Sequence, residues 1–371
     1  GYGKHPPLVA FVLQFFYQIF ENNDWAYYLL SQIFVVIAFF VVWKLSENFF
    51  TDQKYSLISI LILEGIYFYN FTTPEFNVNV CQLPFWALTV YYCWESLKDN
   101  KIKNWILFGI FAAMGILSKY IFISLLFGIS VFFIYLISKE KKFNFRYLIP
   151  LIIIILIVSP HILWLYNNNF STIAYGLNRS GLEGQVLNHL YNPLTFFGKQ
   201  LAILFPFFLM LFFLVSKFKI KFSFKDKKIV FLNAIFISPI ILIFLISLIF
   251  GVKIRTMWMT PFYLFSGVYF IYIFKEKIDF KNFKKFLSIF LFFFIISPIS
   301  YSYISISQEN KRTDYPGKEI ARLVQERWDK NFSNEISIII GDEWYGGNLS
   351  YHLMSRPTWF NSIEKKIKNI N

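Results

Sequence analysis

The sequence predicts an all-α polytopic membrane bundle of about ten transmembrane helices, followed by a small C-terminal α/β domain. Three observations support this prediction. Hydrophobic residues make up 56% of the 371 residues, and 49 residues are Phe, which is more apolar surface than a soluble domain can bury. Basic residues are concentrated in alternate loops. The segment 307–371 is far more polar than the rest of the chain.

Ten apolar segments approach the length of about 20 residues that a helix needs to cross a bilayer core of about 30 Å. The segment 8–20 is shorter and follows Pro6 and Pro7, so we expect it to lie in the membrane interface rather than to cross. The predicted spans are about 25–43, 54–71, 77–97, 105–118, 120–138, 147–166, 196–215, 229–250, 257–274 and 286–306.

The net charge of +14 is distributed unevenly along the membrane part. Five loops hold 20 of the 36 Lys and Arg residues, whereas the alternate loops hold six. This is the positive-inside pattern, which predicts that the five basic loops are cytoplasmic and argues against a nucleic-acid partner. Ten crossings is an even number, so residues 1–24, the loop 167–195 and the tail are expected on the outer face. The basic loops are 44–54, 98–104, 139–146, 216–228 and 275–285.

The tail has a mixed pattern. Residues 314–330 are typical of an amphipathic helix, and Ile336 to Ile340 is a β-branched run typical of a buried strand. Gly346-Gly347 is expected to introduce a short helix, and Arg356-Pro357 a final extended piece. We therefore predict a small soluble domain over residues 307–371.

Polar side chains of the membrane part are concentrated toward the predicted outer face, and such residues are functional candidates because they are costly in lipid. Pro6-Pro7 stiffens the backbone, so it can hold Lys4 and His5 in one place at the membrane surface. The alternative is an interfacial anchor in which the lysine reaches toward water.

The turn 72–79 joins two predicted helices on the outer side and carries a carboxylate and two amides, which are Glu75, Asn77 and Asn79. These groups could face a pocket. The alternative is helix capping by Asn and Thr, which is favoured for Asn79 but not for Glu75.

Two further sites carry basic residues near the outer face. Lys119, next to Tyr120, follows a helix of only about 14 apolar residues, roughly 21 Å long. It would be drawn below the surface, where a bound anion would offset the cost of its charge. Lys253 and Arg255 precede Trp258, and the planar fork of arginine suits phosphate oxygens. The alternatives are snorkelling for Lys119 and a charged loop with an aromatic belt for Lys253 and Arg255.

The long outer loop 167–195 carries Arg179 and begins shortly after His161. A loop of about 30 residues with no clear structure of its own is more often functional than not, although His161 alone would suit a structural hydrogen bond. The chain has no CxxC, HExxH, Walker or GxGxxG motif, so soluble nucleotide chemistry is unsupported. The cofactor stays unknown, and a divalent metal is compatible with the sequence but not indicated by it. A cavity rimmed by cations and open to lipid suits a lipid-linked phosphate.

These residues resemble a known family, the bacterial membrane glycosyltransferases of the GT-C superfamily, which are related to protein O-mannosyltransferases and the lipid A aminoarabinose transferase. Gly1-Tyr2-Gly3-Lys4-His5-Pro6-Pro7-Leu8 is similar to the G-Y-x-x-H-P-P-L string of that family. The similarity continues through Phe76-Asn77-Val78-Asn79, Leu117-Ser118-Lys119-Tyr120, Ser159-Pro160-His161-Ile162-Leu163-Trp164, Gly341-Asp342 and Arg356-Pro357.

The resemblance implies transfer of a sugar from a polyprenyl-phosphate donor to a lipid, glycan or protein acceptor on the periplasmic side of the bacterial inner membrane. It implies that Lys4 and His5 line the catalytic cavity and that Lys119 and Arg255 lie on the phosphate side. In the family, an acidic pair precedes the H-P-P string by a short interval. Here that interval and the first transmembrane helix would lie before Gly1, so the chain is expected to lack the family's catalytic base.

Two other classes of protein predict different sequence features. A transporter or lipid flippase would favour inverted repeats and polar residues near the membrane midplane, and neither is visible in the sequence. A non-enzymatic scaffold would not need cations in a cavity. The predicted catalytic residues are Lys4, His5 and Glu75, and the predicted substrate-binding residues are Asn77, Lys119, Tyr120, His161, Arg179, Lys253 and Arg255; no metal ligand is predicted.

Overall fold

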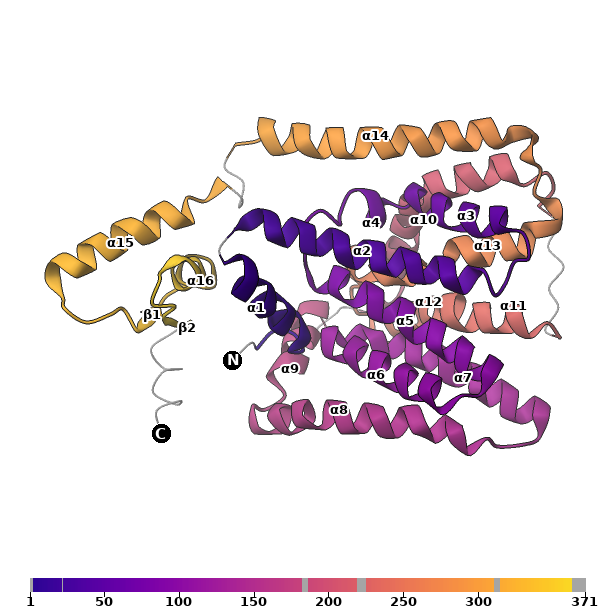
Figure 1. The fold of residues 1–371 in the computed structure, drawn as a ribbon, viewed down its shortest axis with the longest axis horizontal. Coiled ribbons are helices and arrows are strands. Elements are labelled where there is room, and N and C mark those ends of the chain that lie inside the picture. Colours follow the sequence, from indigo (N-terminus) through magenta and orange to yellow (C-terminus); the bar gives the residue numbers. More distant parts are fainter. Residues whose placement is uncertain (1–2, 22, 182–185, 219–224, 310–313, 362–371) are drawn as a thin grey trace. The chain divides into compact units, whose positions relative to one another are not determined.

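The computed structural model describes residues 3–21, 23–181, 186–218, 225–309 and 314–361, and it is mostly helical (Figure 1). Gly1 and Tyr2 of the family string and residues 219–224 of one basic loop lie outside the described residues. The α-helices are α1 (Leu8–Phe20), α2 (Asp24–Ser46), α3 (Gln53–Leu61), α4 (Tyr67–Asn70), α5 (Val78–Asp99), α6 (Ile102–Ser118), α7 (Ile123–Glu140), α8 (Leu148–Asn167), α9 (Ser171–Ser180), α10 (Asn188–Leu214), α11 (Lys227–Leu232), α12 (Ser238–Phe250), α13 (Ser266–Phe274), α14 (Phe283–Ser307), α15 (Gly317–Asn331) and α16 (Glu343–His352).

Short tighter or wider turns connect or continue several of these helices. They are the 3₁₀ turns η1 (Ile62–Gly65), η2 (Tyr120–Phe122), η3 (Phe145–Tyr147), η5 (Thr256–Tyr263), η6 (Lys275–Lys277) and η7 (Phe280–Asn282), and the π-turn η4 (Asn233–Ile237). Two strands, β1 (Ile338–Ile340) and β2 (Thr358–Phe360), pair in parallel. The chain divides into two compact units, one of residues 1–19 and 24–299 and one of residues 20–23 and 300–371.

The second unit contains α15, α16 and the two strands. Its small core includes Ala321, Ile336 and Leu353. Two details of the tail differ from the sequence-based expectation. The strand β1 is exposed or half-buried rather than buried; among the described residues, β2 and α16 pack against it. Gly346 and Gly347 lie inside α16, and Asp342 caps that helix by accepting a hydrogen bond from the Tyr345 N–H.

Within the described part of the chain, six helical segments are long and apolar enough to cross a membrane, or seven if the bent pair 256–263 and 266–277 counts as one span. All ten predicted segments contain helix, but only six or seven of the helical segments in the described part of the chain meet the length and apolarity of a membrane span, so ten crossings are not confirmed. The segment 54–71 is broken into α3, η1 and α4; α6 is only 17 residues long; and α5 is insufficiently apolar.

The polarity of α5 has a structural reason. This helix packs against α2, α6 and η5, and 13 of its 22 residues are buried. A helix enclosed by other helices contacts little lipid, so its side chains need not be uniformly apolar. The protein is therefore a multi-pass membrane protein in which α5 forms part of the interior.

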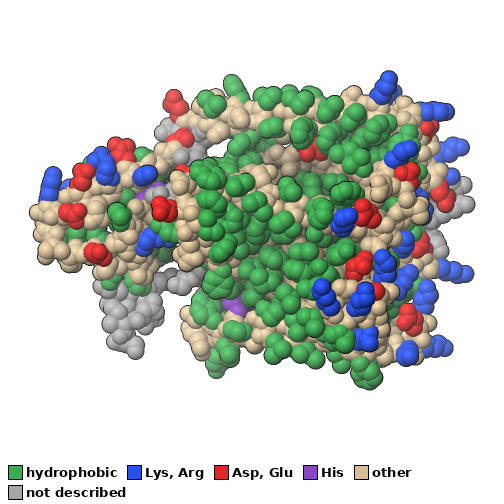
Figure 2. Space-filling view, viewed as in Figure 1, with side chains coloured by type: hydrophobic (Ala, Val, Ile, Leu, Met, Phe, Trp, Pro, Cys, Tyr) green, Lys and Arg blue, Asp and Glu red, His purple; other side chains and the backbone are tan. Residues whose placement is uncertain are grey.

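The two ends of the first unit differ in charge. Figure 2 shows Lys and Arg side chains gathered at one end of the helical bundle, while hydrophobic side chains cover its flank. This end contains the turn after α2, the turn between α5 and α6, and the turn between α7 and α8. Basic loops that are far apart in the sequence thus lie at the same end of the bundle.

Candidate functional site

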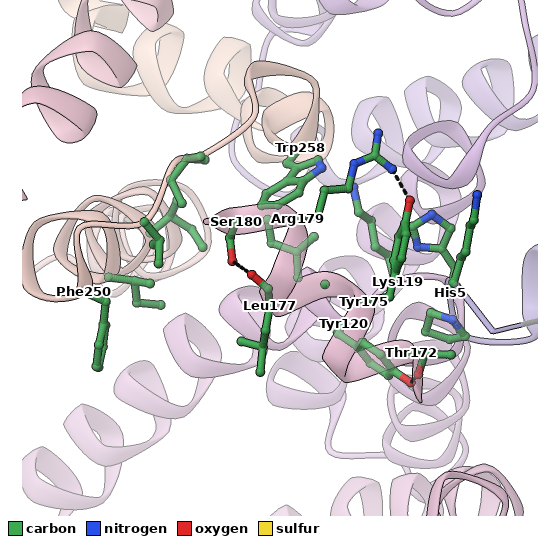
Figure 3. Close-up of a pocket in the computed structure, with 18 residues that line it drawn as sticks. His5, Lys119, Tyr120, Thr172, Tyr175, Leu177, Arg179, Ser180, Phe250 and Trp258 are labelled. Carbon is green, nitrogen blue, oxygen red and sulfur yellow. Dashed lines mark hydrogen bonds between the residues drawn. The ribbon is translucent and has the colours of Figure 1, made fainter. Parts of the chain in front are cut away.

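A cavity of about 460 Å³ lies in the first unit, and three basic side chains line it, those of Lys4, Lys119 and Arg179 (Figure 3). None of its described lining residues is a carboxylate. We call it the cationic cavity. The aliphatic and aromatic part of its lining comes largely from the end of α12 and the segment after it, namely Ile243, Ile246, Phe250, Val252, Ile254 and Trp258.

Lys4 and His5 reach the cavity from the segment before α1, where Pro6 and Pro7 lead into the helix. The Lys4 ammonium lies 5.6 Å from the centroid of the Tyr175 ring, and the His5 ring meets that ring edge-on at 5.8 Å. Burial and the nearby charges of Lys119, Arg179 and Lys4 lower the pKa of His5 from 6.5 to about 4. His5 is therefore neutral at pH 7.

Lys119 lies between α6 and η2 and is only 8% exposed. Its ammonium donates a hydrogen bond to Asn79 Oδ1 and lies 5.5 Å from the Trp258 ring centroid. Both partners are uncharged.

The expectation that Asn79 caps α5 is wrong: Asn77 is the cap, and its Oδ1 accepts from the N–H groups of Asn79 at 2.8 Å and Val80 at 3.3 Å. Asn77 does not line the cavity.

The outer loop 167–195 is not without structure, because it contains the ten-residue helix α9. Thr172, Tyr175 and Arg179 line the cavity from α9 at positions i, i+3 and i+7, which lie on one face of a helix. The Arg179 guanidinium donates to the Tyr175 hydroxyl at 2.6 Å (Figure 3). The sequence analysis missed Tyr175 and Thr172, although this spacing was the signal that could have identified them.

Lys253 and Arg255 do not line the cationic cavity, whereas Val252 and Ile254 do. The segment 251–255 has no regular structure, and Arg255 is extended, with φ −75° and ψ 129°. Successive side chains of an extended segment point in opposite directions. Val252 and Ile254 line the cavity, and the two basic residues between and after them lie outside its lining. The arginine at this cavity is Arg179 rather than Arg255.

Tyr120 and His161 connect the cationic cavity to a second cavity of about 480 Å³. The Tyr120 hydroxyl lies 2.8 Å from His161 Nε2 and 2.6 Å from Thr172 Oγ1. His161 lines the second cavity together with Pro160 and Trp164 of α8, and His5 lines both cavities. The structure thus brings together Lys4, His5, Lys119, Tyr120, His161 and Arg179.

Glu75 is exposed in the turn before α5 and lines neither of these two cavities. In the described part of the chain, no group of three or more His, Cys, Asp or Glu side chains could hold a metal ion. The electrostatic character of the site therefore comes from its basic side chains.

Comparisons with known proteins agree with this geometry. Residues 4–164 match the sequence model of the dolichyl-phosphate-mannose-protein mannosyltransferase family, and this stretch includes Lys4, His5, Lys119, Tyr120 and His161. No curated protein sequence matches the chain.

Two solved structures have the same fold. ArnT from Cupriavidus metallidurans bound to undecaprenyl phosphate has 12% sequence identity and a TM-score of 0.62, and the match covers 100% of this chain and 78% of that one. ArnT from the same organism in the apo state has 12% identity and a TM-score of 0.57, with coverage of 96% and 65%. The similarity to this family over residues 4–164, together with the fold shared with ArnT over the length of the chain, supports the activity of a membrane glycosyltransferase.

Proposed function

We propose that this protein transfers a sugar from a polyprenyl-phosphate-linked donor to a lipid, glycan or protein acceptor, and that the cationic cavity holds the carrier phosphate. One observation carries the proposal: Lys4, Lys119 and Arg179 line one cavity together with the apolar end of α12. A polyprenyl phosphate combines an anionic head with a long apolar chain, so it matches both parts of this lining. The ArnT structure with the same fold was solved with undecaprenyl phosphate, which supports this class of carrier.

Lys119 contributes the strongest electrostatic argument. Its ammonium is almost fully buried, and the two contacts described for it, with Asn79 and Trp258, are with uncharged groups. A buried charge without a charged partner is costly, by several kcal/mol. A phosphate in the cavity would supply that partner and recover part of this cost. The planar guanidinium group of Arg179 would donate further hydrogen bonds to the phosphate, and its hydrogen bond to the Tyr175 hydroxyl would orient it.

Sugar transfer creates negative charge on the carrier. A nucleophilic atom of the acceptor bonds to the anomeric carbon, the bond from that carbon to the phosphate oxygen breaks, and the electron pair leaves with the phosphate. Fixed cations beside that oxygen stabilise the developing charge. The acceptor's proton passes to a general base, and no carboxylate lies among the described residues of the cationic cavity.

The membrane arrangement belongs to the same proposal. We place the basic end of the bundle in the cytoplasm and the cationic cavity at the periplasmic face of the inner membrane, with ten crossings and a soluble domain over residues 307–371. The gathering of Lys and Arg at one end supports this orientation. The helical character of all ten predicted segments, and the enclosure of α5, support the number of crossings.

Binding of undecaprenyl phosphate to the purified protein in lipid nanodiscs tests the assignment. We expect Lys119→Met to weaken binding by about tenfold to a hundredfold, because a hydrogen bond to a charged group contributes about 1.5–3 kcal/mol. Lys253→Met is the matched control, since Lys253 is exposed and outside the cavity lining, and its affinity should equal that of the wild type. Unchanged affinity in a correctly folded Lys119→Met variant would refute the proposed phosphate site.

A second measurement concerns the reaction itself. Membranes containing the protein are supplied with polyprenyl-phosphate sugars labelled in the sugar, and the release of free polyprenyl phosphate is followed. A transferase consumes the labelled donor, whereas a flippase moves the intact donor across the membrane without consuming it. Movement without consumption would support the flippase.

A further inference from the structure

The second cavity, of about 480 Å³, adjoins the cationic cavity but has a different wall. Part of the wall comes from the start of α1, and part comes from Leu117 at the end of α6. The rest is one face of α8, because its lining residues are spaced i, i+3, i+4 and i+7. These residues of α8 are Ile157, Pro160, His161 and Trp164.

Nearly all of this wall is hydrocarbon. Among the described lining residues, the polar side-chain groups are the imidazoles of His5 and His161 and the indole of Trp164. The Nε2 atom of His161 is already paired with the Tyr120 hydroxyl at 2.8 Å. A peptide or a glycan carries many hydrogen-bonding groups, and burying them here without partners is unfavourable. A hydrocarbon chain carries none, so it fits this wall.

The mouth of the second cavity faces lipid. Phe11 of α1 lines the cavity and is 65% exposed, and Pro160 of α8 lines it and is exposed as well. The helix α8 is long and apolar enough to cross the membrane, and most of its residues are exposed or half-buried. A membrane lipid can therefore enter this cavity sideways, between α1 and α8.

His5 shows what kind of molecule occupies the second cavity, because its side chain lines both this cavity and the cationic cavity. Tyr120 lines the cationic cavity, and its hydroxyl is bonded to the His161 ring, which lines the second one. A molecule in the second cavity therefore reaches the proposed position of the carrier phosphate. The carrier chain has an apolar wall of its own, at the end of α12. The second cavity is thus placed for the other reactant.

We propose that the second cavity binds the acceptor, and that the acceptor is a membrane lipid whose nucleophilic oxygen lies beside His5. This inference rests on the proposed function and selects one of its three acceptor classes. The hydrocarbon part of the lipid lies between α1 and α8. Its oxygen bonds to the anomeric carbon of the donor, its proton passes to the general base, and the carrier phosphate leaves with the electron pair into the cationic cavity.

The fate of the sugar tests the acceptor class. Native membranes containing the protein are supplied with a polyprenyl-phosphate sugar labelled in the sugar, and the products are separated into a lipid extract, a protein pellet and a water-soluble fraction. We expect the label in the lipid extract, at a mass different from that of the donor. Label in either of the other fractions would overturn the inference. A wild type that releases no polyprenyl phosphate would refute the proposed function itself, and the inference with it.

Substitutions on α8 test the cavity. Ile157→Trp places a large ring in the lining, and Ile155→Trp is the matched control, because Ile155 is 63% exposed and does not line the cavity. Transfer by Ile157→Trp should fall by about tenfold or more, because a filled pocket rejects the acceptor chain. Transfer by Ile155→Trp should equal that of the wild type. Ala10→Trp, which fills the cavity from α1, should repeat the loss.

Binding of undecaprenyl phosphate shows whether the cationic cavity is intact in these variants. Neither Ala10 nor Ile157 lines that cavity, so both tryptophan variants should bind the carrier with wild-type affinity while losing transfer. Equal transfer by Ile157→Trp and Ile155→Trp would overturn the inference. Lost carrier binding in an Ile157→Trp variant with the wild-type melting temperature would assign the second cavity to the carrier chain instead.

Discussion

At the residue scale, the cationic cavity depends on which of several basic side chains reach it. Arg179 lines the cavity and donates to Tyr175, whereas Arg255 lies outside its lining, in an extended segment. Lys119 is held by Asn79, a residue that the sequence suggested as a helix cap. These distinctions depend on side-chain direction, so they lead to predictions for individual substitutions.

Arg179→Ala should weaken undecaprenyl phosphate binding by about tenfold or more, because it removes a charged donor from the cavity. Arg255→Ala should change the affinity by less than about twofold, because Arg255 does not line the cavity. Isothermal titration in nanodiscs measures both. A larger loss of affinity in Arg255→Ala than in Arg179→Ala would show that Arg255 binds the phosphate, as the family resemblance implied.

His5 provides a pH-dependent signal. Its pKa is lowered to about 4 by burial and by Lys119, Arg179 and Lys4. A bound phosphate supplies negative charge that favours the protonated ring, so the pKa of His5 should rise toward 6.5 in the complex. By linkage, phosphate binding should strengthen as the pH falls from neutral toward 6.5, the value that the pKa of His5 approaches in the complex.

NMR titration of the protein with isotope-labelled histidine measures this shift with and without undecaprenyl phosphate. An unchanged His5 pKa in the saturated complex would place the phosphate elsewhere.

At the element scale, α9 and the segment after α12 complete the cavity. The Thr172–Tyr175–Arg179 face belongs to α9, and Gly251 ends α12 with φ +63°. The turn is tied to α10, because Asn192 Nδ2 donates to the Gly251 carbonyl at 2.6 Å. This turn directs Val252 and Ile254 toward the cavity.

Gly251→Ala should destabilise the protein. A non-glycine residue at this positive φ costs about 1 kcal/mol or more, and the added Cβ would lie 3.1 Å from the His189 ring. The apparent melting temperature should fall by several degrees. Gly198→Ala is the matched control, because its Cβ would enter open space within α10 and alanine favours helix. Equal melting temperatures for the two variants would contradict this account of the turn.

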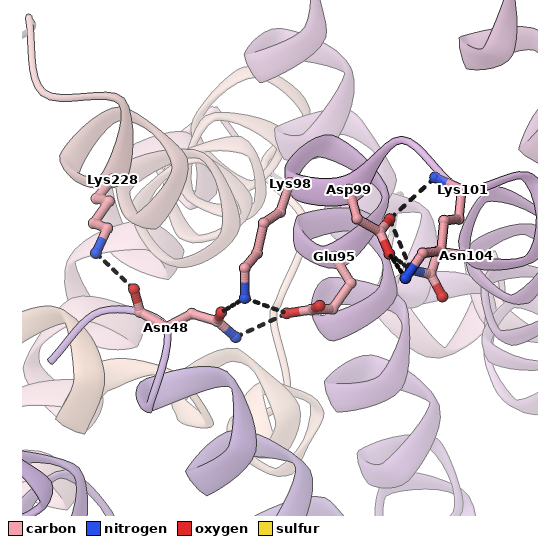
Figure 4. Close-up of polar contacts among 7 residues, drawn as sticks. All are labelled: Asn48, Glu95, Lys98, Asp99, Lys101, Asn104 and Lys228. Atoms are coloured by element: carbon pink, nitrogen blue, oxygen red, sulfur yellow. Dashed lines mark hydrogen bonds and ion pairs between the residues drawn. The ribbon is translucent and has the colours of Figure 1, made fainter. Parts of the chain in front are cut away.

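At the scale of the whole molecule, the basic end of the bundle is also held together by polar side chains (Figure 4). Asn48 Nδ2 donates to Glu95 Oε1 at 2.8 Å, and Lys98 donates to Asn48 Oδ1 at 2.6 Å. Lys228 donates to the Asn48 carbonyl at 2.6 Å. The turn after α2, the last turns of α5 and the start of α11 are therefore linked at this end.

Cysteine accessibility tests the orientation of the membrane part. Lys142→Cys, at the basic end, should react with a membrane-impermeant maleimide only after the inner membrane is opened. Asn168→Cys, after α8, should react in intact cells. Both positions are exposed, and the natural Cys81 and Cys93 are buried, so background labelling should be low. Labelling in the opposite pattern would invert the topology.

The same assay tests whether α5 crosses the membrane. A cysteine at Glu75 should be labelled from outside and one at Lys101 only from the cytoplasm, because these residues flank the two ends of α5. Labelling of both from one side would exclude the crossing and reduce the number of spans.

Composition and loop charge determined by themselves that this is a helical multi-pass membrane protein and where its helices lie. The reason is that a bilayer demands long apolar helices whose backbone groups are paired internally, and this leaves a strong local signal. The match of residues 4–164 confirms the family resemblance carried by local strings such as Lys4-His5-Pro6-Pro7 and Ser118-Lys119-Tyr120. The enclosure of α5 left only a weak signal, because a buried helix need not be apolar.

Only the tertiary structure decided which polar residues meet. Asn79 and Lys119 are 40 positions apart and come together because α5 and α6 pack side by side. Arg179 joins them through α9, while Arg255 lies outside the cavity lining. Such meetings depend on packing between distant segments, for which a single sequence carries no local signal.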